Sequence, residues 1–104
     1  MTAPSRLDAL RAMVQRAPDN MPARFGLANE LLKAGAWAEA AEHLERYLAG
    51  HDDEGNGWGR LADAYEQLGR PDDARAAYDR GIAASHQFGH PGMAAELESR
   101  RDAL

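Results

Sequence analysis

The side chains best suited to hold a metal ion are His86 and His90, two imidazoles four positions apart. Two histidines at this spacing on one helix can share a metal. Here Gly89 stands between them and Pro91 follows, so the helix that would align the pair is expected to break. No third ligand is near them in the sequence. The pattern therefore predicts exposed loop histidines rather than a metal site.

The segment HDDEGNG at 51–57 combines acids with glycines, as loops that bind calcium or phosphate do. It lacks the alternating ligands and the closing glutamate of a calcium loop. The overlapping GNGWG at 55–59 has neither the preceding strand nor the Lys-Ser/Thr pair of a phosphate loop. We therefore interpret this segment as a solvated connection whose glycines serve as spacers.

Composition excludes further classes of site. The chain of 104 residues contains no cysteine, so disulfides, thiolate metal sites and a cysteine nucleophile are ruled out. Its net charge of -5 opposes nucleic acid and anionic membranes as general partners. No secretory signal pattern opens the chain, and no apolar run approaches the ~20 residues that cross a bilayer. We expect one cytoplasmic domain, without catalytic residues or a cofactor.

The strongest pattern in the chain is an internal repeat. A shift of 34 residues superposes identical residues, among them Leu27 on Leu61, Ala28 on Ala62, Gly35 on Gly69, Ala40 on Ala74 and Arg46 on Arg80. A fixed period of this length is typical of stacked-repeat proteins. Within each unit, apolar residues recur at three- and four-residue steps before and after the glycine. Each unit is therefore predicted to be two helices joined by a short turn.

Partial units flank these two repeats. A leading half-repeat is expected at 5–16, with Ser5 as its cap and an apolar face that includes Met13. The full repeats occupy 21–54 and 55–88, and a capping helix occupies 90–104. Terminal helices of this kind close a repeat stack against solvent. The prediction is an all-α domain of about six helices and no strand, with four aromatic residues in its core: Trp37, Trp58, Tyr65 and Tyr78.

The order Trp58, Leu61-Ala62, Tyr65, Gly69, Ala74, Tyr78 resembles the tetratricopeptide repeat. With the half-repeat and the cap, the resemblance covers nearly the whole chain. The first repeat departs from the pattern, since Arg24 replaces the opening aromatic residue and Leu31 replaces the tyrosine. The resemblance implies a right-handed superhelical stack whose first helices line a concave groove that binds a peptide or a partner helix. The related RNA-binding pentatricopeptide repeats have a longer period and a basic groove, which the acidity of this chain disfavours.

The resemblance also implies which residues line the groove. Each first helix turns its remaining side chains into it, so the predicted partner-binding residues are Phe25, Asn29, Leu32, Lys33, Asn56, Arg60, Asp63 and Gln67. The capping helix would extend this row with His90, Ala94, Leu97 and Arg101. Phe25 either lies exposed in the groove or packs on the leading helix. The family's clamp for C-terminal carboxylates is incomplete, because only Asn29 matches it.

The sequence thus favours a non-catalytic module that binds another protein. Two alternatives stay open at this stage. One is a self-associating structural protein, a homodimer formed through the stack ends or the convex face, with Leu97 and Leu104 as possible contacts. The other is a chaperone for assembling or secreted subunits.

Overall fold

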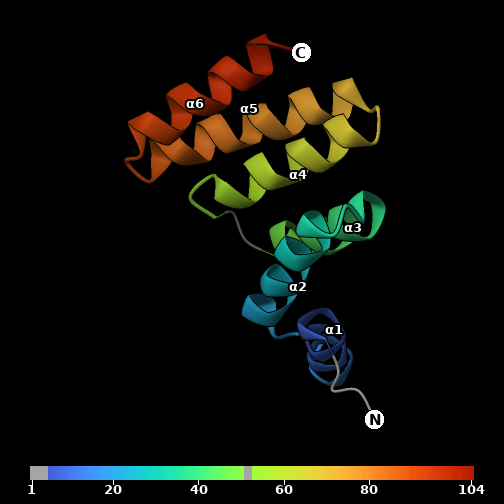
Figure 1. The fold of residues 1–104 in the computed structure, drawn as a ribbon. Helices are drawn as coiled ribbons and strands as arrows, with labels where there is room; N and C mark the ends of the chain where they lie inside the picture. The colour runs from blue at the N-terminus through green and yellow to red at the C-terminus, as the bar shows by residue number, and fades with distance from the viewer. Residues whose placement is uncertain (1–4, 51–52) are drawn as a thin grey trace.

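The computed structural model describes residues 5–50 and 53–104, and in these ranges the chain forms six α-helices and no strand. They are α1 (Arg6–Arg16), α2 (Met21–Lys33), α3 (Trp37–Ala49), α4 (Asn56–Gln67), α5 (Pro71–Gln87) and α6 (Pro91–Asp102). Each helix packs against the next one along the chain. The result is a stack with α1 at one end and α6 at the other (Figure 1), which confirms the predicted all-α repeat architecture. His51 and Asp52, in the predicted connection at 51–57, lie outside the described residues.

The turns inside the helical pairs share one geometry. Gly35, Gly69 and Gly89 have φ angles of 75°, 71° and 74°, in the left-handed region where a residue with a Cβ is strained. After α2, the amide of Gly35 donates to the carbonyl of Leu32 at 3.1 Å, and that of Ala36 donates to Leu31 at 2.9 Å. These two bonds form a Schellman motif, which satisfies carbonyls that the end of the helix leaves without partners. The glycine that the repeat pattern placed after each first helix is thus a structural requirement.

The helix starts are fixed by local hydrogen bonds and by proline. Ser5 Oγ accepts from the amide of Asp8 at 3.1 Å, and Asn20 Oδ1 accepts from that of Ala23 at 3.1 Å. Each bond satisfies an amide that has no partner within its own helix. At α4 the same role falls to Asp53, whose carboxylate accepts from the amides of Gly55 at 2.9 Å and Gly57 at 2.6 Å. Asp53 is therefore a structural cap of α4.

The buried side chains form two clusters. One lies between α1 and the first repeat and contains Leu10, Val14, Leu27 and Leu31; the other joins the two repeats to α6. Leu32 packs against both clusters and so connects them. The prediction that Met13 faces inward is wrong, because 45% of its surface is exposed. In the half-repeat, Leu10 and Val14 are buried and Leu7 packs against the same cluster.

A polar contact takes the place of an aromatic residue in the first repeat. Arg24 is only 4% exposed, and its guanidinium lies 2.9 Å from Nδ1 of His43 and donates to the carbonyl of Pro18 at 3.1 Å. Burial, and next the charge of Arg24, lower the pKa of His43. Arg11 of α1 donates two hydrogen bonds to Glu39 of α3, at 3.1 and 2.8 Å, and these bonds lower the pKa of that carboxyl. Hydrogen-bonded charges thus link the first three helices.

Candidate functional site

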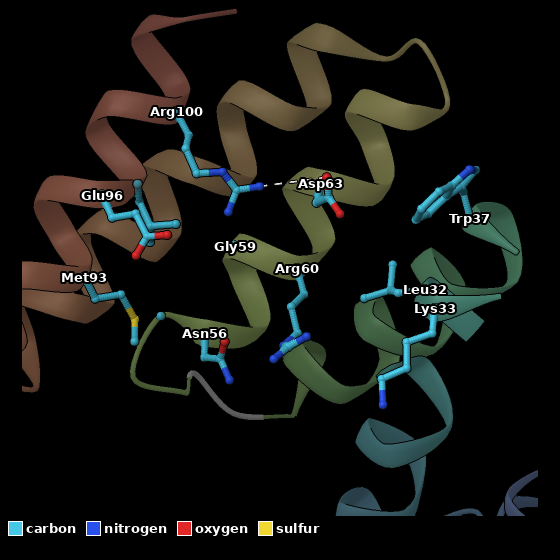
Figure 2. A pocket seen from close by; sticks show the side chains of 12 residues that line it. Leu32, Lys33, Trp37, Asn56, Gly59, Arg60, Asp63, Met93, Glu96 and Arg100 are labelled. Carbon is cyan, nitrogen blue, oxygen red and sulfur yellow. Dashed lines mark ion pairs between the residues drawn. The ribbon is translucent and has the colours of Figure 1, made fainter. Parts of the chain in front are cut away.

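A groove of about 440 Å³ lies over the outer face of α4. One wall comes from the α2–α3 corner, the floor from the start of α4, and the other wall from α6 (Figure 2). We refer to it as the α4 groove. Its lining consists of Leu32, Lys33, Trp37, Gly55, Asn56, Gly59, Arg60, Asp63, Met93, Glu96, Leu97 and Arg100.

The floor follows from the spacing of residues on α4. Asn56, Gly59, Arg60 and Asp63 recur at three- and four-residue steps, which places them on one face of the helix. The middle of this face has no side chain, because a Cβ at Gly59 would come within 2.9 Å of Leu97 Cδ2. Leu97 of α6 therefore packs directly over Gly59, which is buried. The rest of the floor consists of the polar side chains of Asn56, Arg60 and Asp63.

The wall at the α2–α3 corner holds Leu32, Lys33 and Trp37, brought together by the turn at Gly35. Lys33 Nζ lies 3.4 Å from Glu30 at the edge of the wall. The prediction that Trp37 belongs to the core is wrong: it is half-buried and lines the groove. Because Trp37 is the first residue of α3, only part of its ring can pack against the helices behind it. The corner thus presents an aromatic ring beside a cation.

The wall from α6 corrects the row predicted for the capping helix. The lining residues are Met93, Glu96, Leu97 and Arg100, and they do not include His90, Ala94 or Arg101. Arg101 instead bonds Asp79 of α5 at 2.8 Å. The reason is the packing of Leu97, which approaches both Gly59 and Gly81 and so fixes the rotation of α6 about its axis.

Arg100 is held in place by two contacts. One of its guanidinium nitrogens lies 3.8 Å from Asp63 across the groove (Figure 2). The guanidinium carbon lies 5.3 Å from the centre of the Tyr78 ring, within the range of a cation–π contact. Tyr78 itself donates a hydrogen bond to Glu66, and burial together with this bond raises the pKa of its phenol. The pair of Arg100 and Asp63 therefore closes one end of the groove without net charge.

Five of the eight predicted binding residues line the α4 groove, namely Leu32, Lys33, Asn56, Arg60 and Asp63. Asn29 and Gln67 do not. Gln67 is exposed at the end of α4, about one turn beyond Asp63. Asn29 is partly buried, and its Oδ1 is shielded from solvent without a hydrogen-bond partner.

Phe25 follows neither of the two alternatives considered for it. It lies outside the groove lining, and its ring stacks on Tyr47 of α3, with the ring centres 4.7 Å apart. The guanidinium of Arg60 lies 5.8 Å from the Phe25 ring. Phe25 thus packs between the two repeats, and its ring supports the guanidinium of Arg60.

The charges of the groove are separated between its walls. Arg60 is exposed on the side of α2, and Glu96 is exposed on α6. Among residues 5–50 and 53–104, no acidic side chain pairs with Arg60 and no basic one pairs with Glu96. The α4 groove therefore has a cationic side, with Arg60 and Lys33, and an anionic side at Glu96.

Of the two histidines considered as metal ligands, His90 lies in the α5–α6 turn, but His86 belongs to the last turn of α5, so the prediction that both are loop residues is wrong. His86 Nε2 is 3.8 Å from Glu98, and His90 directly precedes α6. Within the described residues, no three side chains among His, Cys, Asp and Glu gather closely enough to hold a metal ion. In that same part of the chain, no helix is long and apolar enough to cross a membrane.

Comparisons with known proteins agree with the architecture. The family model described as tetratricopeptide repeat matches residues 7–59 and, in an overlapping second match, 31–91. A TPR repeat-containing protein of Pseudomonas aeruginosa is 34% identical over 83 residues, which cover 80% of this chain and 79% of that protein. The solution structure of a protein from Bordetella parapertussis superposes with a TM-score of 0.81 at 25% identity, covering 97% of this chain and 88% of that one.

Proposed function

The chain belongs to the tetratricopeptide repeat family, and from this premise we propose that it binds a segment of another protein in the α4 groove. Repeats of this family generally mediate protein–protein interaction and are typically not catalytic. The proposed role here is that of a non-catalytic adaptor. The proposed contacts are the five predicted residues in the groove together with Trp37, Met93, Glu96 and Arg100.

The observation that supports this proposal best is the content of the groove. It combines apolar side chains with two charged groups, Arg60 and Glu96, that have no partner of opposite charge among residues 5–50 and 53–104. Unpaired charges beside a partly exposed tryptophan are typical of surfaces that carry binding energy, since Trp and Arg dominate the energetics of interfaces. A surface that served only to cover the core would not need this combination.

The proposal is tested by affinity capture with quantitative mass spectrometry and a purified candidate partner. Trp37→Ala and Arg60→Glu remove groove contacts, whereas Arg75→Glu reverses a charge on α5 outside the groove and serves as the matched control. We expect the groove variants to lose at least one partner that the control retains. Isothermal titration with that purified partner should show a loss of about tenfold or more in affinity. Groove variants that keep every partner would show that the groove is not the binding surface.

Self-association through the stack ends receives less support. Leu97, considered as a seed for such contact, is 4% exposed and packs in the core. Among residues 5–50 and 53–104, the large exposed apolar residues are Met13, Phe88 and Leu104, which belong to α1, the α5–α6 turn and the C-terminal end. Residues scattered in this way do not form the contiguous patch that an obligate interface requires. Light scattering over a range of concentrations gives the oligomeric state directly.

A further inference from the structure

We infer that the segment bound in the α4 groove is an amphipathic α-helix, with an acidic side chain against Arg60 and a basic one against Glu96. This inference rests on the proposed function and specifies the partner of that same groove. It follows from three properties of the lining: its few amide groups, its apolar side chains on both walls, and its separated charges.

The first property concerns the backbone of the occupant. An extended peptide brings amides and carbonyls that need partners when they are buried, and side-chain amides are suited to pair with both. Asn56 is the one side-chain amide in the lining. Asn29 and Gln67 lie outside it, and Asp63 is already 3.8 Å from Arg100. A helix satisfies its own backbone groups, so it needs only side-chain contacts from this groove.

The second property is the apolar surface on the two walls. Leu32 and Trp37 lie on the wall from α2 and α3, and Met93 lies on the wall from α6 (Figure 2). Between the walls, Leu97 packs over the buried Gly59, so the apolar side chains available to an occupant come from both sides of α4. Amphipathic helices bind such grooves through apolar residues at i, i+3, i+4 and i+7.

The third property sets the charge pattern of the partner. Arg60, with its guanidinium near the Phe25 ring, and Glu96 on α6 are both without a partner of opposite charge in the described chain. They lie on opposite sides of Gly59 (Figure 2). Complementary charges on the two edges of an apolar stripe would orient the helix as well as attract it. A purely acidic or purely basic segment would leave one of these two groups opposed by like charge.

The inference can be tested with a displayed library of random peptides of about 16 residues, long enough for four helical turns. Selection against the wild-type protein is followed by counter-selection against Trp37→Ala, which retains only peptides that use the groove. We expect these peptides to carry apolar residues at helical spacing, an acid along one edge and a base along the other. A central proline substitution should abolish their binding, since it breaks a helix.

Charge reversal then identifies the contacts. Arg60→Glu should weaken the selected peptides about tenfold, and replacing the peptide's acid by lysine should restore affinity. Glu96→Lys should act in the same way on the peptide's base, and Arg75→Glu should change nothing. Fluorescence anisotropy with labelled synthetic peptides measures each affinity.

The outcomes separate this inference from the proposed function. Groove-dependent peptides that tolerate the central proline or lack helical spacing would overturn the helix while leaving groove binding intact. Groove-dependent helices unaffected by Arg60→Glu and Glu96→Lys would overturn the charge pattern. A selection that yields no groove-dependent peptide would contradict both proposals.

Discussion

The two repeats fill equivalent space in opposite ways. In the first repeat, Phe25 and Tyr47 stack with ring centres 4.7 Å apart. A shift of 34 residues places Gly59 and Gly81 at these positions in the second repeat. There the space is taken by Leu97 of α6, whose methyl carbons would lie 2.9 Å from a Cβ at either glycine.

This difference explains where the groove lies. In the first repeat an aromatic pair fills the space, whereas in the second repeat a glycine pair leaves the space to Leu97 of the capping helix. With Leu97 packed there, Met93, Glu96 and Arg100 lie at the edge of the groove. Because packed interiors tolerate little empty volume, the two glycines and the capping leucine act as one unit. The shape of the α4 groove therefore depends on which side chains each repeat omits.

The substitution expected to have the largest effect is Gly81→Tyr. It gives the second repeat the tyrosine that the first repeat has at the equivalent position, Tyr47. The new ring would occupy the place of Leu97 and of Trp58, whose Cβ lies 3.0 Å from a Cβ at Gly81. Overpacking of this kind should lower the free energy of unfolding by about 3 kcal/mol. Chemical denaturation measures the loss, and hydrogen exchange should show α6 released first.

Gly92→Ala is the matched control, since a Cβ there meets nothing within 4 Å. It should leave stability nearly unchanged. A Gly81→Tyr protein as stable as the wild type, with α6 still protected, would show that Leu97 does not need the space above the glycines.

A second contrast involves Leu31 and Tyr65, which occupy equivalent positions. Only Tyr65 carries a hydroxyl, which donates to Glu45 of α3 at 2.7 Å. Burial, and next this bond, raise the pKa of the phenol. Tyr65→Phe should therefore cost about 1 kcal/mol of stability.

The control for this prediction is a double-mutant cycle with Glu45→Ala. Once Glu45 is absent, the cost of Tyr65→Phe should largely disappear. Additive costs in the double mutant would mean that the hydroxyl gains its stability from another source.

The smallest expected effect concerns Arg24, the first-repeat counterpart of Trp58. The contact between Arg24 and His43 at 2.9 Å requires a neutral imidazole. The folded protein holds the pKa of His43 below its usual value, so the unfolded chain binds the proton more readily. Stability should then be highest above pH ~6.5 and should fall as the pH drops through that value. Since His43 keeps part of its surface in water, we expect a loss below about 1 kcal/mol.

Denaturation midpoints between pH 7.5 and pH 5.5 measure this dependence. His43→Gln should remove the part of the pH dependence of stability that comes from this histidine. Arg24→Met should remove only part, because burial, the larger cause of the lowered pKa, remains. Equal slopes in the wild type and in His43→Gln would show that protonation of this histidine does not destabilise the fold.

Sequence periodicity was sufficient to predict the helices, their turns and most of the groove floor. The three-residue and four-residue steps along Asn56, Arg60 and Asp63 define one face of a helix wherever that helix lies. On α6 the same argument was right only for Leu97, because Met93, Glu96 and Arg100 line the groove one position before the predicted row. The signal that could have corrected it was the glycine pair, because two aligned glycines on neighbouring helices require a large side chain from elsewhere.

The repeat, its helices and the side of α4 that faces outward can be read from the sequence, because they depend on local backbone preferences and on apolar spacing. How the helices are rotated against one another depends on tertiary packing. The packing of Leu97 against Gly59 and Gly81 orients α6. The ring of Phe25 packs on Tyr47 outside the groove, and the corner at Gly35 places Trp37 in the groove lining. Such rotations depend on the fit of side chains distant in sequence, which no local pattern records.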